Sequence, residues 1–526
     1  MKNLISLILL SYCFQITAQI SEGGLPYASN KMLFKSQAAI PEYSLKKLET
    51  EKLLKEDTEN PTPVRYSIFE EVNIDLKSGI SEEISDPAGT VWKYAITSEN
   101  ANSIQVVFNS FNIPAGAKLF LYNNDYSEIY GAFTQKNVQE DHTFIIADFP
   151  GSRVILEYFE PADADFKGIV KIGSIGQAYK NILKNELDVE ATNYIDINCH
   201  EGRYWQTEKH AVCKITFRTG NTGYLCSGAL INNTKNDGTP YFLTANHCID
   251  DSASAKTLVA YFNYEKKSCN GSSNEDKTLT GSNLVTTGSN SDFTLLKLNN
   301  TPPVSYQPFY AGWDISAYRD NLNASIHHPE GLEKKISVDN DPISTFDFVI
   351  AWDEGGTTPP SSHWLVNFDA GATNEGSSGA PLFSKQKRII GQLHGGGDGE
   401  EFYGKLNYSW NNSTSGYKQL KTYLDPTNSG VKTLDGYTPD KIVPDAFFST
   451  PFKDICLNFP VVFNDYSAFS PASREWIITP TGYKFVNGTD KNSQNPNIEF
   501  TKAGNYNVKL RVSNNNGKNS LQINNV

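Results

Sequence analysis

Tyr-Phe-Leu-Thr-Ala-Asn-His-Cys, residues 241–248, has the pattern of a buried strand that ends in a turn carrying a histidine and a cysteine. Two further strings follow it along the chain, Ser-Asp-Phe-Thr-Leu-Leu from Ser291 and Gly-Ser-Ser-Gly-Ala-Pro from Gly376. Together they provide His247, Asp292 and Ser378. A serine hydroxyl becomes nucleophilic when an imidazole takes its proton, and a carboxylate fixes the tautomer of that imidazole. We therefore interpret the three residues as a candidate catalytic triad.

The glycines around Ser378 favour the same chemistry. Backbone N–H groups can reach a developing oxyanion only where no side chain intervenes, and we assign Gly376 and Ser378 as the two donors. Ser377 is the less suitable nucleophile from its register. His247 has no Cys-x-x-Cys or His-x-x-x-His pattern beside it, so no metal site is predicted there. The pair His327–His328 is interpreted as structural.

Around these strings, the composition is that of a globular, β-rich chain. The 526 residues are 39% hydrophobic and 20% charged, with a formal net charge of −13. This negative charge argues against nucleic acid or an anionic membrane as the partner. Alternating segments punctuated by Gly, Asn and Pro favour strands over long helices, and one helix is expected at 417–424.

The N-terminus has the features of an export signal, with Lys2 before an apolar stretch that is too short to span a bilayer. We expect residues 1–19 to be a cleaved signal and the protein to be secreted. Removing the signal removes Cys13 and leaves six cysteines, which allow fifteen pairings in an oxidising compartment.

The rest of the chain divides into three regions. Residues 20–184 are expected to form a β-sandwich, residues 185–436 contain the three strings, and residues 444–526 form a small third domain with Trp476 in its core. The third domain resembles a PKD domain, an immunoglobulin-like sandwich.

Residues 190–435 resemble a bacterial lysyl endopeptidase, a secreted trypsin-like serine protease. The similarity is carried by the three strings, by Ala-Gly-Trp-Asp at 311–314, Ile-His-His-Pro at 326–329 and Gly-Gln-Leu-His-Gly-Gly at 391–396. The resemblance implies an all-β, chymotrypsin-like fold of two six-stranded antiparallel barrels. It also implies hydrolysis of peptide bonds after lysine without a cofactor, by a monomer acting on proteins or peptides.

The resemblance further implies roles for single residues. It implies the disulfides Cys226–Cys248 and Cys199–Cys269 and leaves Cys213 and Cys456 unassigned. Glu401 takes the position of the acid in the primary pocket, with Glu375 and Asp398 as rivals. Trp352 and His394 match a pair that stacks beside the active site, although Trp352 can equally be a core residue. Gly395 would lie on the substrate edge.

In this scheme residues 20–184 are a pro-region, cleaved near Lys184–Asn185, and the third domain contacts a surface or polymer. Two alternatives remain open. One is a serine protease of different or broader specificity, and the other is a secreted binding or adhesion protein whose protease-like domain is inactive.

Overall fold

The computed structural model describes residues 20–30, 39–59, 63–183, 193–273, 277–316, 321–352, 355–397, 399–449 and 455–526. The expected signal at 1–19, the expected cleavage site at Lys184–Asn185 and the rival acid Asp398 lie outside these residues. Among the described residues, no helix combines the length and the apolar character that crossing a bilayer requires.

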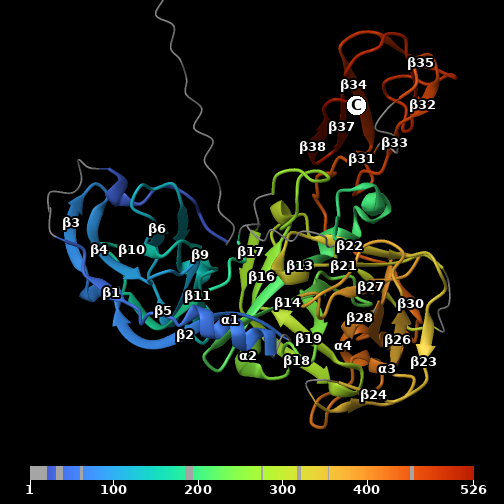
Figure 1. Ribbon diagram of the computed structural model, residues 1–526. Coiled ribbons are helices and arrows are strands. Elements are labelled where there is room, and N and C mark those ends of the chain that lie inside the picture. Colours follow the sequence, from blue (N-terminus) through green and yellow to red (C-terminus); the bar gives the residue numbers. More distant parts are fainter. Residues whose placement is uncertain are drawn as a thin grey trace, which may run out of the picture.

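The N-terminal part of the chain, blue to teal in Figure 1, is built from two sheets that face each other. Alternate residues of one strand, Ile104, Val106 and Phe108, point into the core between the sheets, as the period of two in a strand requires. The first sheet consists of β1 (Glu42–Ser44), β3 (Ile80–Ser85), β4 (Ala88–Thr97), β10 (Arg153–Pro161), β6 (Lys118–Tyr122) and β7 (Ile129–Phe133). Helix α1 (Thr50–Glu59) precedes the second sheet in the chain.

The second sheet does not end at the N-terminal part but continues into the middle of the chain. Its N-terminal strands are β2 (Val64–Asp75), β11 (Ile169–Ala178), β5 (Ser103–Asn112), β8 (Phe144–Ile145) and β9 (Phe149–Pro150). Strand β2 pairs antiparallel with β14 (Thr222–Leu230), from Thr222 opposite Ile68 to Leu225 opposite Val64. The sequence did not predict this junction, because edge pairing uses backbone groups and leaves little trace in side-chain pattern.

The remaining strands of this sheet form the first barrel-like sheet of the middle region. They run in the order β17, β16, β13, β14, β15, β19, β18. Their bounds are β13 (Val212–Thr219), β15 (Tyr241–Ala245), β16 (Val259–Phe262), β17 (Lys277–Thr280), β18 (Ser282–Gly288) and β19 (Phe293–Leu298). A short helix, α2 (Ser252–Lys256), is capped by Asp251, whose carboxylate accepts from the N–H groups of Ala253 and Ser254.

A second sheet of ten strands packs against the first. Its strands are β12 (Ile195–Asp196), β22 (Lys335–Asp339), β21 (Asn323–His327), β27 (Pro381–Phe383), β28 (Arg388–Gly397), β29 (Glu400–Lys405), β26 (His363–Val366), β23 (Ser344–Phe346), β20 (Gly312–Asp314) and β30 (Thr433–Leu434). A two-stranded sheet, β24 (Ile350–Ala351) and β25 (Thr357–Thr358), lies beside it. One core cluster joins the two large sheets, with Leu243 and Leu295 from the first and Ile326 and Ile389 from the second. The all-β class expected from the sequence is thus confirmed, with barrel-like sheets in the middle region. The first of these sheets continues into the N-terminal strands.

Only the end of the helix expected at 417–424 is helical. Helix α3 (Leu406–Ser409) comes before it, and α4 covers just Lys421–Leu424. Tyr417 instead closes a separate turn, because its N–H donates to Thr414 O and its carbonyl accepts from the Ser413 hydroxyl. The helix ends before Asp425–Pro426, as predicted.

The C-terminal domain, red in Figure 1, buries Trp476 between small sheets. Phe448 and Phe463 contact this ring, with centroids 5.1 and 6.0 Å away. The strands are β31 (Phe448–Ser449), β32 (Pro460–Val462), β33 (Asn464–Asp465), β34 (Ser473–Thr479), β35 (Tyr483–Val486), β36 (Asn497–Phe500), β37 (Asn507–Asn514) and β38 (Gly517–Ile523).

Two disulfides brace the middle region. Cys226–Cys248 closes a loop of 22 residues next to His247, and Cys199–Cys269 joins residues 70 positions apart. These are the two pairs that the resemblance implied. Cys213 is free and buried, as expected for a small apolar side chain, while Cys456 is free and exposed.

Candidate active site

His247 and Asp292 are brought together by one strand pair. Strand β15 pairs with β19 so that Ala245 lies opposite Phe293, and the two polar residues stand just beyond this pair. The His247 Nδ1 atom lies 2.8 Å from Asp292 Oδ2, and the His247 backbone N–H donates to Asp292 Oδ1 at 2.8 Å. The carboxylate therefore fixes both the ring and the backbone of His247.

Burial makes the charge state of Asp292 important. Desolvation raises the pKa of this carboxyl, but His247, through its charge and its two hydrogen bonds, brings it below its ordinary value. Asp292 has φ of 54°, a left-handed conformation that aspartate tolerates better than most residues. An ionised carboxylate in this position stabilises an imidazolium at His247.

The turn that carries Asp292 rests on the second large sheet. Gln392 Nε2 donates to the carbonyls of Ser291 and Asp292, at 2.7 and 3.3 Å. Gly404 permits this contact, since a Cβ there would lie 1.9 Å from Ser291 O. Sequence reasoning missed both residues, because each acts on a turn about 100 positions away.

Ser378 lies in a glycine turn that packs against the strand leading to His247. Gly376 and Gly379 have φ of 88° and 80°, which favours glycine. A Cβ on Gly379 would come within 2.3 Å of Thr244 Oγ1 and 2.7 Å of Ala245 N. The backbone N–H of Ser227 donates to Ser378 O at 2.8 Å and ties the turn to β14.

The two adjacent serines have different surroundings. Ser377 is fully buried, and its hydroxyl lies 2.8 Å from His327 Nδ1. His327 also contacts the Ser337 hydroxyl through Nε2 at 3.1 Å, while His328 Nδ1 donates to Leu332 O at 2.9 Å. Ser377 and the two histidines thus form hydrogen bonds inside the protein that hold this loop. Ser378 is 6% exposed and retains contact with solvent.

The backbone around Ser378 leaves two donors unused. In the part of the chain that the structure describes, the N–H groups of Gly376 and Ser378 have no protein acceptor, whereas Ser377 N–H donates to Asn374 O. An oxyanion formed at Ser378 requires two such free N–H groups as hydrogen-bond donors.

A histidine and a tryptophan stack beside the His247–Asp292 pair. The rings of Trp352 and His394 have centroids 3.5 Å apart, and His394 lies 5.5 Å from His247 in a nearly parallel orientation. His394 Nε2 is 3.8 Å from Asp292 Oδ2. A Cβ on Gly395 would contact Trp352 at 3.5 Å, which places Gly395 against the same stack.

His363 extends this group, and its contacts determine where the protons are. The Ser362 hydroxyl donates its one hydrogen to Pro359 O at 2.6 Å, so it can only accept from His363 Nδ1, 2.7 Å away. Burial lowers the pKa of His363 to about 4, and its Nε2 is then unprotonated and accepts from His394 Nδ1 at 3.0 Å. Burial also lowers the pKa of His394 to about 3, so its Nε2, facing Asp292, carries no proton at neutral pH.

Glu401 lies under the loop that leads to Ser378. It stands opposite Gly396 in the pairing of β28 with β29, and it accepts a hydrogen bond from the Thr373 hydroxyl. A Cβ on Gly396 would lie 2.5 Å from Glu401 Oε2, so the missing side chain leaves the carboxylate room. Burial raises the pKa of Glu401. Of its rivals, Glu375 is only half-buried, and Asp398 lies outside the described residues.

Two regions of the chain match known family models. Residues 190–404 match the family model of the lysyl endopeptidase C-terminal domain. Residues 456–526 match the PKD domain, so both resemblances expected from the sequence are confirmed.

The lysyl endopeptidase of Pseudomonas aeruginosa is 30% identical over 237 residues, which cover 43% of this chain. The chain spans about half the length of this relative, 49%. Similar solved structures include a thermostable serine protease AL20 (16% identity, 38% of this chain, 93% of that chain, TM-score 0.27) and the protease Anisep from Arthrobacter nicotinovorans (17% identity, 37% of this chain, 90% of that chain, TM-score 0.28).

Proposed function

We propose that the protein is a serine endopeptidase in which Ser378, His247 and Asp292 form the catalytic triad. The observation that carries the proposal is the His247–Asp292 pair, bonded twice at 2.8 Å with Asp292 buried. Beside it, the glycine turn of Ser378 packs against the strand that leads to His247. The match of residues 190–404 to the lysyl endopeptidase domain supports the same chemistry.

In this mechanism His247 takes the proton of the Ser378 hydroxyl while Oγ attacks the peptide carbonyl. The N–H groups of Gly376 and Ser378 donate to the oxyanion of the tetrahedral intermediate, and Asp292 stabilises the imidazolium. His247 then protonates the departing amine, and a water molecule hydrolyses the acyl-enzyme by the reverse sequence. The scheme uses protein groups and water throughout, with no cofactor.

The decisive test compares the two neighbouring serines. Ser378→Ala should lower kcat for a peptide substrate by about 10⁴-fold or more and abolish labelling by a fluorophosphonate. Ser377→Ala removes the contact with His327 and a weak hydrogen bond from Asn374 N, 3.3 Å away, and should keep most of the activity if the protein folds. Labelling that survives in Ser378→Ala would contradict the assignment. A wild-type protein that folds but neither hydrolyses peptides nor takes the label would favour a binding or adhesion protein instead.

We further propose that cleavage follows lysine, with Glu401 as the acid of the primary pocket. A carboxylate in a buried pocket attracts an ammonium group and repels acidic side chains. The alternative is broader specificity, and it is favoured by the hydrogen bond that already engages Glu401 with Thr373. Cleaving a peptide library and reading the residue before each cut distinguishes the two. Cuts spread over apolar residues would contradict the lysine preference.

The other regions then acquire proposed roles. Residues 1–19 would direct export and residues 20–184 would act as a pro-region. Residues 185–436 would be the protease, a secreted monomer, and residues 444–526 a PKD-like domain that contacts a surface or polymer. N-terminal sequencing of secreted protein tests the first boundary, since a start far from Asn185 would contradict cleavage after Lys184.

A further inference from the structure

We propose that Glu330 is a positioning residue for the oxyanion hole, and that Tyr194 holds Glu330 in place. The inference rests on the proposed function, because it concerns the donors assigned to the oxyanion. Neither residue belongs to the strings from which the triad was identified.

The first step concerns the two peptide groups that supply the donors. In a trans peptide the C=O and N–H bonds point in opposite directions, so a carbonyl fixed on one side directs its N–H to the other. The Ser377 carbonyl, which shares a peptide group with Ser378 N–H, accepts from Ala380 N at 2.9 Å. This bond lies within the turn itself, so the Ser378 donor is oriented locally.

The Gly376 donor depends on a distant residue instead. The Glu375 carbonyl, which shares a peptide group with Gly376 N–H, accepts from Glu330 N at 2.6 Å. A glycine with φ of 88° follows this peptide group and gives it little steric resistance to rotation. The bond from Glu330 therefore holds the Gly376 N–H turned away from Glu330.

Glu330 needs support to present its N–H in this way. It has φ of 54° and ψ of 17°, a left-handed conformation that is unfavourable for a residue with a Cβ. Its side chain supplies the support. Glu330 Oε1 accepts from the Tyr194 hydroxyl at 2.8 Å and from Asn374 Nδ2 at 2.8 Å. Asn374 immediately precedes Glu375, so the side chain and the backbone of Glu330 bind the same loop.

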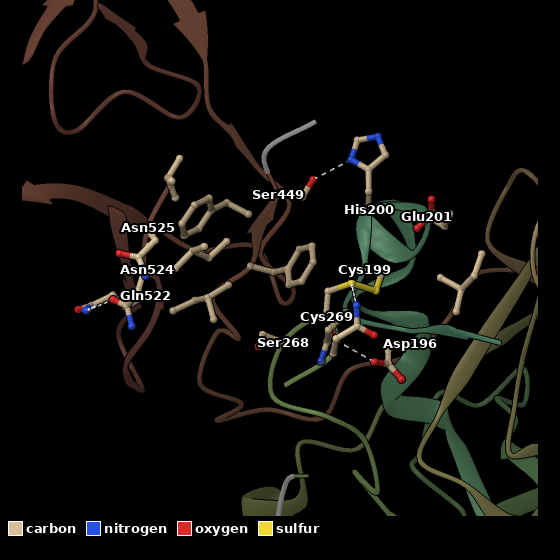
Figure 2. A pocket seen from close by; sticks show the side chains of 18 of the residues that line it. Asp196, Cys199, His200, Glu201, Ser268, Cys269, Ser449, Gln522, Asn524 and Asn525 are labelled. Carbon is tan, nitrogen blue, oxygen red and sulfur yellow. Dashed lines mark hydrogen bonds between the residues drawn. A yellow bond between two sulfur atoms is a disulfide. The ribbon is translucent and has the colours of Figure 1, made fainter. Parts of the chain in front are cut away.

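Several contacts hold the segment that follows Tyr194 in the chain. The next residue, Ile195, begins β12 and pairs with Ile336 of β22. Asp196 forms an ion pair with Lys335 and accepts from Asn270 N at 2.9 Å, close to the Cys199–Cys269 disulfide, as Figure 2 shows. This segment also lines a pocket of about 990 Å³ together with residues of the C-terminal domain. Figure 2 shows Ser449 and Gln522 of that domain among the lining residues. Burial and the contact with Glu330 raise the pKa of Tyr194, so its hydroxyl remains a donor.

The experiment measures transition-state stabilisation separately from substrate binding in the active enzyme that is obtained from the full chain. Tyr194→Phe should lower kcat about 2–10-fold, the range of one hydrogen bond, and Glu330→Ala should lower it further, within the 10²–10³-fold that loss of an oxyanion donor costs. KM should change less than about twofold in both. Affinity for a peptide aldehyde ending in lysinal, whose hemiacetal oxygen occupies the hole, should fall by the same factor as kcat.

Glu330→Gln retains an acceptor at the same place and should restore most of kcat. Tyr306→Phe is the matched control, since it removes a buried tyrosine hydroxyl that donates to Thr278 O at 3.2 Å in the first barrel. It should leave kcat and aldehyde affinity unchanged. Binding of a simple alkylamine in the primary pocket should be unchanged in every variant.

Several outcomes would overturn the inference. Wild-type kcat and aldehyde affinity in both Tyr194→Phe and Glu330→Ala would do so, as would parallel losses of aldehyde and alkylamine affinity. If Glu330→Ala fails to fold, the test rests on the ratio of aldehyde affinity to alkylamine affinity in the other two variants. This ratio should fall in Tyr194→Phe and stay close to the wild-type value in Glu330→Gln, and a wild-type ratio in Tyr194→Phe would overturn the inference. Failure of the proposed function is distinct, because the wild-type enzyme itself would then show no Ser378-dependent hydrolysis.

Discussion

At the scale of single residues, burial determines the protonation of the groups around the candidate site. Asp292 stays ionised because His247 offsets the cost of its burial, whereas Glu401, with a hydroxyl as its partner, has a raised pKa. These two carboxyls are therefore expected to respond differently to acid.

The raised pKa of Glu401 predicts a pH-dependent KM. As the pH falls through this pKa, Glu401 loses its negative charge, and KM for a lysyl peptide should rise. KM for a norleucyl peptide, which has no ammonium group, should change little. Steady-state kinetics between about pH 5 and 8 measure both. Glu401→Gln should remove the difference in pH dependence, and a variant that retains it would show that another acid binds lysine.

The hydrogen bonds from Ser362 to His394 predict one tautomer. His394 should carry its proton on Nδ1 and His363 on Nδ1 as well, which ¹⁵N chemical shifts of the ring nitrogens distinguish directly. In Ser362→Ala the acceptor for His363 is lost, so His363 should populate the other tautomer. A proton found on Nε2 of His394 in the wild-type protein at neutral pH would contradict the deduction.

At the scale of elements, the pairing of β2 with β14 links the N-terminal region to the site. Leu225 of β14 packs with Val64 and Ile182 from the N-terminal region, and a Cβ on Gly376 would lie 2.6 Å from Leu225 Cδ1. The N-terminal region therefore supports the loop around Gly376, which we propose to bind the oxyanion.

This junction predicts a specific effect of a bulky residue at Gly223, which lies opposite Ser67. A Cβ there would lie 2.0 Å from Ser67 Oγ, so Gly223→Val should weaken the pairing by about 1–3 kcal/mol. The yield of active enzyme from the full chain should fall severalfold, as measured by active-site titration after refolding. Thr222→Val, a β-branched change at the neighbouring position, is the control. Equal yields from both variants would exclude this role of the pairing.

The sequence predicted the candidate catalytic residues, but it did not predict the residues that hold them in position. His247, Asp292 and Ser378 each lie in a local string whose pattern of strand and turn can be recognised. Contacts with residues remote in sequence define the roles of Gln392, Gly404, His363 and Glu330, and no local pattern marks such contacts. The short α4 has a similar explanation, since side-chain and turn contacts at Ser413–Tyr417 replace helical ones.

At the scale of the whole molecule, a buried charge network joins the third domain to the protease region. Lys209 Nζ lies 2.8 Å from Glu265 Oε1 and 3.4 Å from Asp445 Oδ2, and Lys334 also pairs with Glu265, at 3.1 Å. Burial opposes ionisation of Glu265, but the two lysines lower its pKa to about 2. The pKa of Asp445 is lowered in the same way by Lys209 and His210.

Both carboxyls have folded pKa values below their ordinary ones, and this fixes the sign of the pH effect. Their stabilisation is complete above the ordinary pKa of glutamate, 4.5, and is lost as the pH falls towards about 2. Asp445→Ala should destabilise the protein by about 1–3 kcal/mol at neutral pH, because it leaves the buried Lys209 with Glu265 as its one carboxylate partner. The loss should shrink below pH 4. Urea unfolding at several pH values measures this, and a difference that stays constant with pH would contradict the assignment.

By itself, the sequence determined the all-β class, the three catalytic candidates and the family resemblance of two regions, because these depend on local pattern and on strings of adjacent residues. The tertiary structure decided which serine hydroxyl turns into the core, where the protons of His363 and His394 lie, and how Glu330 orients Gly376. It also decided that the N-terminal sheet continues into the first barrel. Each of these depends on hydrogen bonds and close approaches between residues far apart in the chain, which only folding brings within contact.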